Sequence, residues 1–256
     1  MNDAGTTVFI DNETVVPIEK ININVYEKEF EIALIGSHQT IQMIRITIPN
    51  VDQECFSESD LKVVQELKEH MLSILRLNYD STANSPINVY SFRKTEDFAD
   101  LSFTYNTRIN DDFDIRTKMI IGSYSSSMPF RNQVKLLADS IRKEIPIQYR
   151  FLSLYKLLEL EFKIAGKWTD EFNMYINEFS SDFEILGISS RTLENYIHEL
   201  RDKCAHIKSN KDIVSITELS QPDSISMENF LPLMTKIAAI IINRRYSNEN
   251  FGIQIH

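Results

Sequence analysis

Two residues late in the chain have the types and spacing that phosphodiester cleavage requires. Arg201 carries a charge that it keeps at neutral pH, and His206, five positions later, carries an imidazole, the side-chain type that titrates near neutrality. An arginine can hold a phosphate and stabilise the charge that develops on it, while an imidazole can accept or supply a proton. The pair therefore predicts a site that acts on a phosphodiester.

The neighbours of this pair add to the prediction. Asp202 and His206 are four positions apart, so on a helix they share a face and a carboxylate could fix the imidazole tautomer. At about 100° per residue, Arg201 and His206 lie roughly 140° apart on a continuous helix, so one site holds both only if the helix ends or a second copy contributes. Three lysines are candidates for binding a nucleic-acid backbone: Lys203, Lys208 and Lys211.

Ordinary structural roles also fit these residues. Arg201 and Asp202 could be solvated surface charges, and the dipole of a helix favours a histidine such as His206 near its C-terminus. Cys204, inside the motif, fits a small buried residue. Both interpretations stay open at the level of the sequence.

The residues after position 129 have helical periodicity. The segment 147–165 is apolar on nearly all sides, which predicts a central helix of a bundle. Trp168 is expected to open the helix that Thr169 or Asp170 caps, and Ser189 or Ser190 is expected to cap the helix that carries Arg201. The other predicted helices are 134–141 and 227–245, the latter after a polar loop over 209–224.

In this setting, the run Arg201-Asp202-Lys203-Cys204-Ala205-His206 resembles the signature of HEPN domains, an arginine followed after a few residues by a histidine. The order of elements is also similar: an apolar helix containing Tyr155-Lys156-Leu157-Leu158-Glu159, the motif near a helix end, then a terminal helix. The resemblance covers about residues 130–246. It implies a four-helix bundle that forms a homodimer, with the arginine and histidine lining a cleft between two protomers.

Active HEPN proteins are metal-independent endoribonucleases, so the resemblance implies RNA as substrate, 2′-hydroxyl transesterification, no metal and no cofactor. It also suggests a toxin or defence effector. Arg201, His206 and Asp202 are then the candidate catalytic residues, with Tyr155 and Glu159 as supporting groups. Two alternatives remain: a non-catalytic HEPN-like module that binds RNA, nucleotides or protein, and a structural dimerisation protein.

The first half of the chain has strand character. Alternating polarity over 8–48 predicts antiparallel strands with one solvent-exposed face. Apolar residues at helical spacing over 61–78 predict one main helix, capped by Ser57 or Ser59. Further strands are expected at 87–92, 101–105 and 117–121, with a turn at 110–114 and a serine-rich boundary loop at 122–129. The prediction is a two-domain α+β chain: a β-rich domain, 1–128, and a HEPN-like helical bundle, 129–256.

Composition limits the class of protein. The 256 residues are 43% hydrophobic and 25% charged, which is typical of a globular protein. A net charge of −10 argues against coating nucleic acid by bulk electrostatics, and two distant cysteines suggest neither a disulfide framework nor a zinc site. We expect a cytoplasmic protein without a membrane segment, whose N-terminal domain could bind a regulatory protein or ligand.

Overall fold

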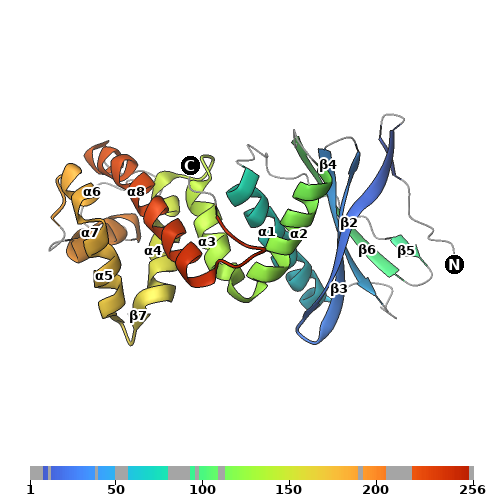
Figure 1. Cartoon of the computed structure of the whole chain (residues 1–256), viewed down its shortest axis with the longest axis horizontal. Coiled ribbons are helices and arrows are strands. Elements are labelled where there is room, and N and C mark those ends of the chain that lie inside the picture. Colours follow the sequence, from blue (N-terminus) through green and yellow to red (C-terminus); the bar gives the residue numbers. More distant parts are fainter. Residues whose placement is uncertain are drawn as a thin grey trace. The chain divides into compact units, whose positions relative to one another are not determined.

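A computed structural model gives the fold of the chain. It falls into two compact units (Figure 1): Met1–Pro129 with Asn248–Gly252, here called the sheet unit, and Phe130–Ser247 with Ile253–His256, here called the helical unit. The structure describes residues 8–10, 13–37, 40–49, 57–79, 93–95, 98–108, 113–189, 193–205 and 221–253. The predicted strand 87–92 lies outside the described residues.

The sheet unit is built on an antiparallel sheet, as the alternating polarity predicts. Within the described residues the strands are ordered β1-β2-β3-β4-β6-β5. Their bounds are β1 (Val8–Ile10), β2 (Glu13–Val25), β3 (Lys28–Ser37), β4 (Thr40–Pro49), β5 (Arg93–Thr95) and β6 (Phe98–Arg108). The β2–β3 connection is a two-residue turn, Tyr26 and Glu27, both with positive φ (50° and 63°), which is the backbone of a type I′ hairpin.

Two helices pack on this sheet, not one as predicted. Helix α1 (Glu58–Tyr79) contacts β4, and α2 (Phe113–Ser127) contacts β2 and α1; Figure 1 shows both on the same side of the sheet. The prediction that Ser57 caps α1 is confirmed, because the Asp60 N–H donates to Ser57 Oγ at 3.1 Å. The core of the unit includes Phe30, Ile32, Leu34, Ile44, Ile46, Val64, Leu67, Met71, Leu75, Ile120 and Tyr124.

The predictions for the segment that forms α2 were wrong. The expected strand 117–121 and the expected loop 122–129 are helical, with a 3-10 turn, Met128–Phe130, after α2. A short run with β-branched residues favours a strand by propensity, but its pattern alone does not distinguish it from a buried helix segment, so tertiary packing decides. Here Tyr124 is buried, and Ser127 Oγ donates to the Ser123 carbonyl (2.6 Å) and hydrogen-bonds His70 Nε2 of α1 (3.1 Å). Of these serines, Ser127 hydrogen-bonds α1, and Ser123 Oγ donates to the Asn250 carbonyl at 2.8 Å.

The predicted turn at 110–114 is corrected in its last two residues. Residues 110–112 lie outside the described residues, while Phe113 and Asp114 begin α2. The acidic stretch therefore precedes a helix, not a strand.

The helical unit is a bundle centred on α4 (Ile147–Phe162). This helix packs against α3 (Arg131–Ile141), α7 (Leu193–Ala205) and α8 (Gln221–Tyr246), as its broadly apolar sequence predicts. Two shorter helices, α5 (Asp170–Glu178) and α6 (Ser180–Ile185), complete the described part of the unit. Helix α8 begins at Gln221, so the last part of the predicted polar loop is helical.

Helix α4 ends three residues earlier than predicted, and Trp168 does not open a helix. Strands β7 (Lys163–Ile164) and β8 (Lys167–Trp168) form a hairpin through Ala165 and Gly166, whose φ values are 48° and 82°. Thr169 then caps α5 by accepting from the Phe172 N–H at 3.4 Å, as expected. The consequence is that Lys163 and Trp168 face each other across a pair of short strands.

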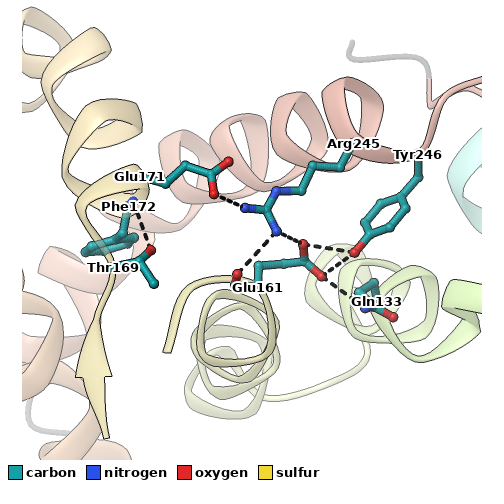
Figure 2. Close-up of polar contacts among 7 residues, drawn as sticks. All are labelled: Gln133, Glu161, Thr169, Glu171, Phe172, Arg245 and Tyr246. Carbon is teal, nitrogen blue, oxygen red and sulfur yellow. Dashed lines mark hydrogen bonds and ion pairs between the residues drawn. The ribbon is translucent and has the colours of Figure 1, made fainter. Parts of the chain in front are cut away.

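A buried ion-pair network ties α3, α4, α5 and α8 together (Figure 2). The Glu161 side chain, 2% exposed, accepts from Arg245 Nη1 (2.7 Å), from the Tyr246 hydroxyl (2.8 Å) and from Gln133 Nε2 (3.0 Å). Arg245 also pairs with Glu171. Burial lowers the pKa of Arg245, but the bonds to the two carboxylates outweigh this effect and raise it.

Helix α8 is the one described helix long and apolar enough to cross a membrane by length and composition. The stretch Ile225–Tyr246 has a mean hydropathy of 1.5, and half of it is buried within the protein. The core helix of a globular bundle meets the same criterion, and α8 packs on α3 and α4.

Asp60 joins α1 to β3 in the sheet unit. Its carboxylate accepts hydrogen bonds from the Lys28 ammonium and from the Ser57 hydroxyl (2.6 Å). Burial raises the pKa of Asp60, but these bonds and the Lys28 charge outweigh burial and hold the pKa below its ordinary value of 3.8. Such a group contributes stability above its unfolded-state pKa, and this contribution is lost as the pH falls through the folded-state pKa.

Asp60→Asn is therefore expected to destabilise the sheet unit by roughly 1–2 kcal/mol near neutral pH, and by less below about pH 4. Urea unfolding followed by circular dichroism measures this, while fluorescence of Trp168, the single tryptophan, reports the helical unit. Glu58→Gln, which removes an exposed partner of Lys62 in the same helical turn, is the control and should have little effect. A difference between wild type and Asp60→Asn that is independent of pH would contradict the prediction.

Candidate functional site

The candidate site is formed by two rows of side chains on the neighbouring helices α4 and α7. Helix α7 buries Leu193, Ile197, Leu200 and Cys204. Beside this buried stripe, α7 carries His198 and Arg201, three positions apart and so on one face. Tyr155 and Glu159 form the matching row on α4, and Lys163 continues it just after the helix ends.

Arg201 lies where the two rows meet. Its Nη1 donates to Asp202 Oδ1 at 2.8 Å, its Cζ lies 5.9 Å from the centre of the Tyr155 ring, and 37% of its side chain is exposed. The Asp202 bond, with Tyr155 and Glu159 nearby, raises the pKa of Arg201 against the opposing effect of burial. Arg201 is thus a permanent cation, oriented by its neighbours and accessible to solvent, as binding of a phosphate requires.

Glu159 is held between two lysines. Its carboxylate accepts from Lys156 Nζ (3.1 Å) and Lys163 Nζ (3.0 Å). Burial raises the pKa of Glu159, but the two lysines outweigh burial and lower it, while the bond to Glu159 raises the pKa of Lys163. Glu159 therefore stays ionised at neutral pH, which suits positioning of cations and not proton transfer.

Aromatic rings form the base of the site. The Tyr155 ring, 3% exposed as a residue, meets Trp168 edge to face at 6.0 Å, and Trp168 stacks on Phe172 at 4.3 Å. Lys163 Nζ lies over the rings of Tyr155 (5.8 Å) and Trp168 (5.1 Å). These cation–π contacts hold Lys163 and Arg201 on one aromatic surface.

His198 completes the cluster. Its Nδ1 and the Tyr155 hydroxyl form a hydrogen bond at 3.4 Å, and the two rings lie 5.9 Å apart. Trp168 is a further ring neighbour at 6.5 Å. Among the residues that the structure describes, none hydrogen-bonds the other ring nitrogen, Nε2. The imidazole is therefore oriented through one nitrogen, which leaves the second for other contacts.

The charges of the cluster are balanced, although the chain as a whole is acidic. Lys156, Lys163 and Arg201 are three cations against three carboxylates, Glu159, Asp202 and Glu194, which lies four positions before His198 on α7, whereas the whole chain carries −10. Arg201, whose side chain is partly exposed, is the group of the cluster that suits an anionic ligand. Within the described residues no group of three or more His, Cys, Asp or Glu side chains is placed to hold a metal ion.

The structure brings together some of the residues selected from the sequence and separates others. Arg201, Asp202, Tyr155 and Glu159 belong to one cluster. Lys203 is exposed, but two positions after Arg201 on a helix it points about 200° away around the axis, so it is not part of this cluster. His206, Lys208 and Lys211 lie outside the described residues, as does any contact between Asp202 and His206.

Sequence reasoning missed His198, Lys163 and Trp168. A signal for two of them was present: His198 precedes Arg201 by three residues, and Lys163 extends the four-residue spacing of Tyr155 and Glu159. Trp168 could not be found this way, since its position depends on the hairpin β7–β8.

No family model, curated protein or solved structure that was compared with the chain matches it.

Proposed function

We propose that the chain is a metal-independent endoribonuclease of the HEPN type that cleaves RNA by 2′-hydroxyl transesterification. The observation that carries the proposal is the Arg201 cluster: a permanent, partly exposed cation held by Asp202 and Tyr155, with His198 on the same face of α7. The motif Arg201 to His206 supplies the family resemblance.

In the proposed mechanism, Arg201 binds the scissile phosphate through its guanidinium fork. The RNA 2′-oxygen attacks phosphorus and loses its proton, the bond from phosphorus to the 5′-oxygen breaks, and that oxygen gains a proton. Arg201 stabilises the charge of the pentacoordinate state, and His206 performs one of the two proton transfers. The products are a 2′,3′-cyclic phosphate and a 5′-hydroxyl.

The proposal includes a homodimer and a regulatory role for the sheet unit. A dimer is favoured by the family resemblance and by exposed apolar residues on α4 and just after it, Leu160 (57% exposed) and Ile164 (72%). The sheet unit contains none of the residues of the Arg201 cluster. We therefore assign it a regulatory role, in which it binds a protein or ligand that controls RNA cleavage, as in a toxin or defence effector.

Incubation of labelled RNA with the purified chain in EDTA tests the proposed function. We expect cleavage of RNA but not of a DNA strand of the same sequence, because DNA lacks the attacking 2′-hydroxyl. His206→Ala should slow cleavage by about 10²-fold or more. Binding of RNA without cleavage would instead favour the non-catalytic module, and absence of binding at low salt would favour a structural dimerisation protein.

A further inference from the structure

We propose that His198 is the second proton-transfer group of the RNA-cleaving site, with Tyr155 as its positioning residue. This inference rests on the proposed function and deepens it. The Arg201–His206 motif contains a single imidazole, whereas the reaction moves two protons: one leaves the 2′-hydroxyl and another reaches the departing 5′-oxygen. The second transfer falls to another titratable group or to water, and in the proposed homodimer the second copy of His206 is the alternative to His198 for this role.

The position of His198 suits this role. It lies three residues before Arg201 on the same face of α7, a spacing that puts the Cβ atoms about 5–6 Å apart. A phosphate bound by the Arg201 guanidinium therefore lies within reach of the imidazole. Because Arg201 keeps 37% of its side chain exposed, such a phosphate can approach from solvent.

The hydrogen bonding of His198 also suits proton transfer. The Tyr155 hydroxyl engages Nδ1 at 3.4 Å, and no described residue engages Nε2. A hydroxyl can donate to Nδ1 or accept from it, so Tyr155 can support either tautomer and also the doubly protonated ring. The ring can thus take up a proton at Nε2 or release one there without losing its anchor.

The charged and titratable groups around His198 come from each element packed near it. Helix α4 contributes Tyr155 and Glu159, and the strand β7 contributes Lys163. Helix α7 itself contributes Arg201 at three positions from His198, and Glu194 and Asp202 at four. Glu159 is paired with Lys156 and Lys163, and Arg201 with Asp202, so cations and carboxylates around the imidazole are equal in number when Glu194 is included. A phosphate beside the imidazole would therefore be bound by Arg201 itself and not by an excess of positive charge.

The pH dependence of cleavage tests the proposal with His198→Gln. Wild type should show a bell-shaped rate profile, and His198→Gln should lose about 10²-fold in rate together with one limb of the bell. His206→Gln should lose the opposite limb. Tyr155→Phe keeps the ring and removes the hydroxyl, so it should slow cleavage by a smaller factor and retain both limbs. Glu199→Gln, an exposed neighbour on α7, is the control and should behave as wild type.

Failure of this inference is distinguishable from failure of the proposed function. If wild type cleaves RNA and His198→Gln retains both limbs at a rate within about twofold of wild type, His198 is not a proton-transfer group. If wild type does not cleave RNA, the proposed function itself fails. Should His198→Gln not fold, NMR of imidazole-labelled wild type with a 2′-O-methyl RNA decides: a shifted His198 resonance supports the proposal, and an unchanged one overturns it.

Discussion

Arg201→Ala is expected to slow RNA cleavage by about 10²–10³-fold, the usual cost of removing one donor that stabilises a developing oxyanion. Stability should change little, because its ion pair with Asp202 is solvent-exposed and such pairs contribute about 1 kcal/mol or less. Arg201→Lys keeps the charge but loses the planar fork, so it should recover only part of the rate. Cleavage assays in EDTA, with thermal unfolding of each variant, measure both effects.

Arg244→Ala is the matched control for this prediction. Arg244 is also a partly exposed arginine of the helical unit, but it pairs with Glu178 and lies over the Tyr175 ring, outside the candidate site. Its replacement should leave the rate within a few-fold of wild type. Equal losses in Arg201→Ala and Arg244→Ala would mean that the arginine acts through general electrostatics and not at the site.

Glu161→Ala is expected to lower the free energy of unfolding of the helical unit by about 2–4 kcal/mol. Breaking a buried ion pair leaves an uncompensated charge and costs about 3–5 kcal/mol, and the estimate is reduced because Arg245 is 24% exposed and keeps its bond to Glu171. The change also removes the acceptor for Tyr246 and Gln133 (Figure 2). Urea unfolding followed by Trp168 fluorescence measures the loss.

Two further variants separate charge from hydrogen bonding in this network. Glu161→Gln keeps one side-chain oxygen as an acceptor, so its loss should lie between that of Glu161→Ala and wild type. Glu178→Gln removes the exposed partner of Arg244, an ion pair that joins α5 to α8. This change should scarcely alter the unfolding midpoint. If Glu161→Ala were as mild as Glu178→Gln, the network would not hold the bundle together.

The fold was predictable where local signals and tertiary packing agree. The Ser57 cap and the apolar spacing along α1 both indicate a helix, and Thr169 likewise marks the start of α5. At α2 the local signals and the tertiary packing conflict. Thr117 to Ile121 have strand propensity, whereas burial of Tyr124 and the hydrogen bond between Ser127 and His70 favour a helix. Partners such as these are distant in sequence, so no local pattern reveals them.

The candidate site was also predictable only in the part that depends on local sequence. The spacing of Tyr155 and Glu159 on one helix was visible, and so was the Arg201 motif, so these residues could be selected from the sequence. That α4 and α7 pack together, and that the β7–β8 hairpin brings Lys163 over Tyr155 and Trp168, depends on the whole bundle. For the same reason His198, whose one signal in the sequence is its spacing of three residues from Arg201, becomes a candidate only beside Tyr155.

The chemical ends of the RNA products test the central claim most directly. RNA cut in EDTA should carry 2′,3′-cyclic phosphate and 5′-hydroxyl ends by mass spectrometry, and these products should be lost with Arg201→Ala and Arg201→Lys in proportion to their rates. The account would be contradicted by 3′-hydroxyl and 5′-phosphate ends, or by undiminished cyclic-phosphate products from a folded Arg201→Ala protein.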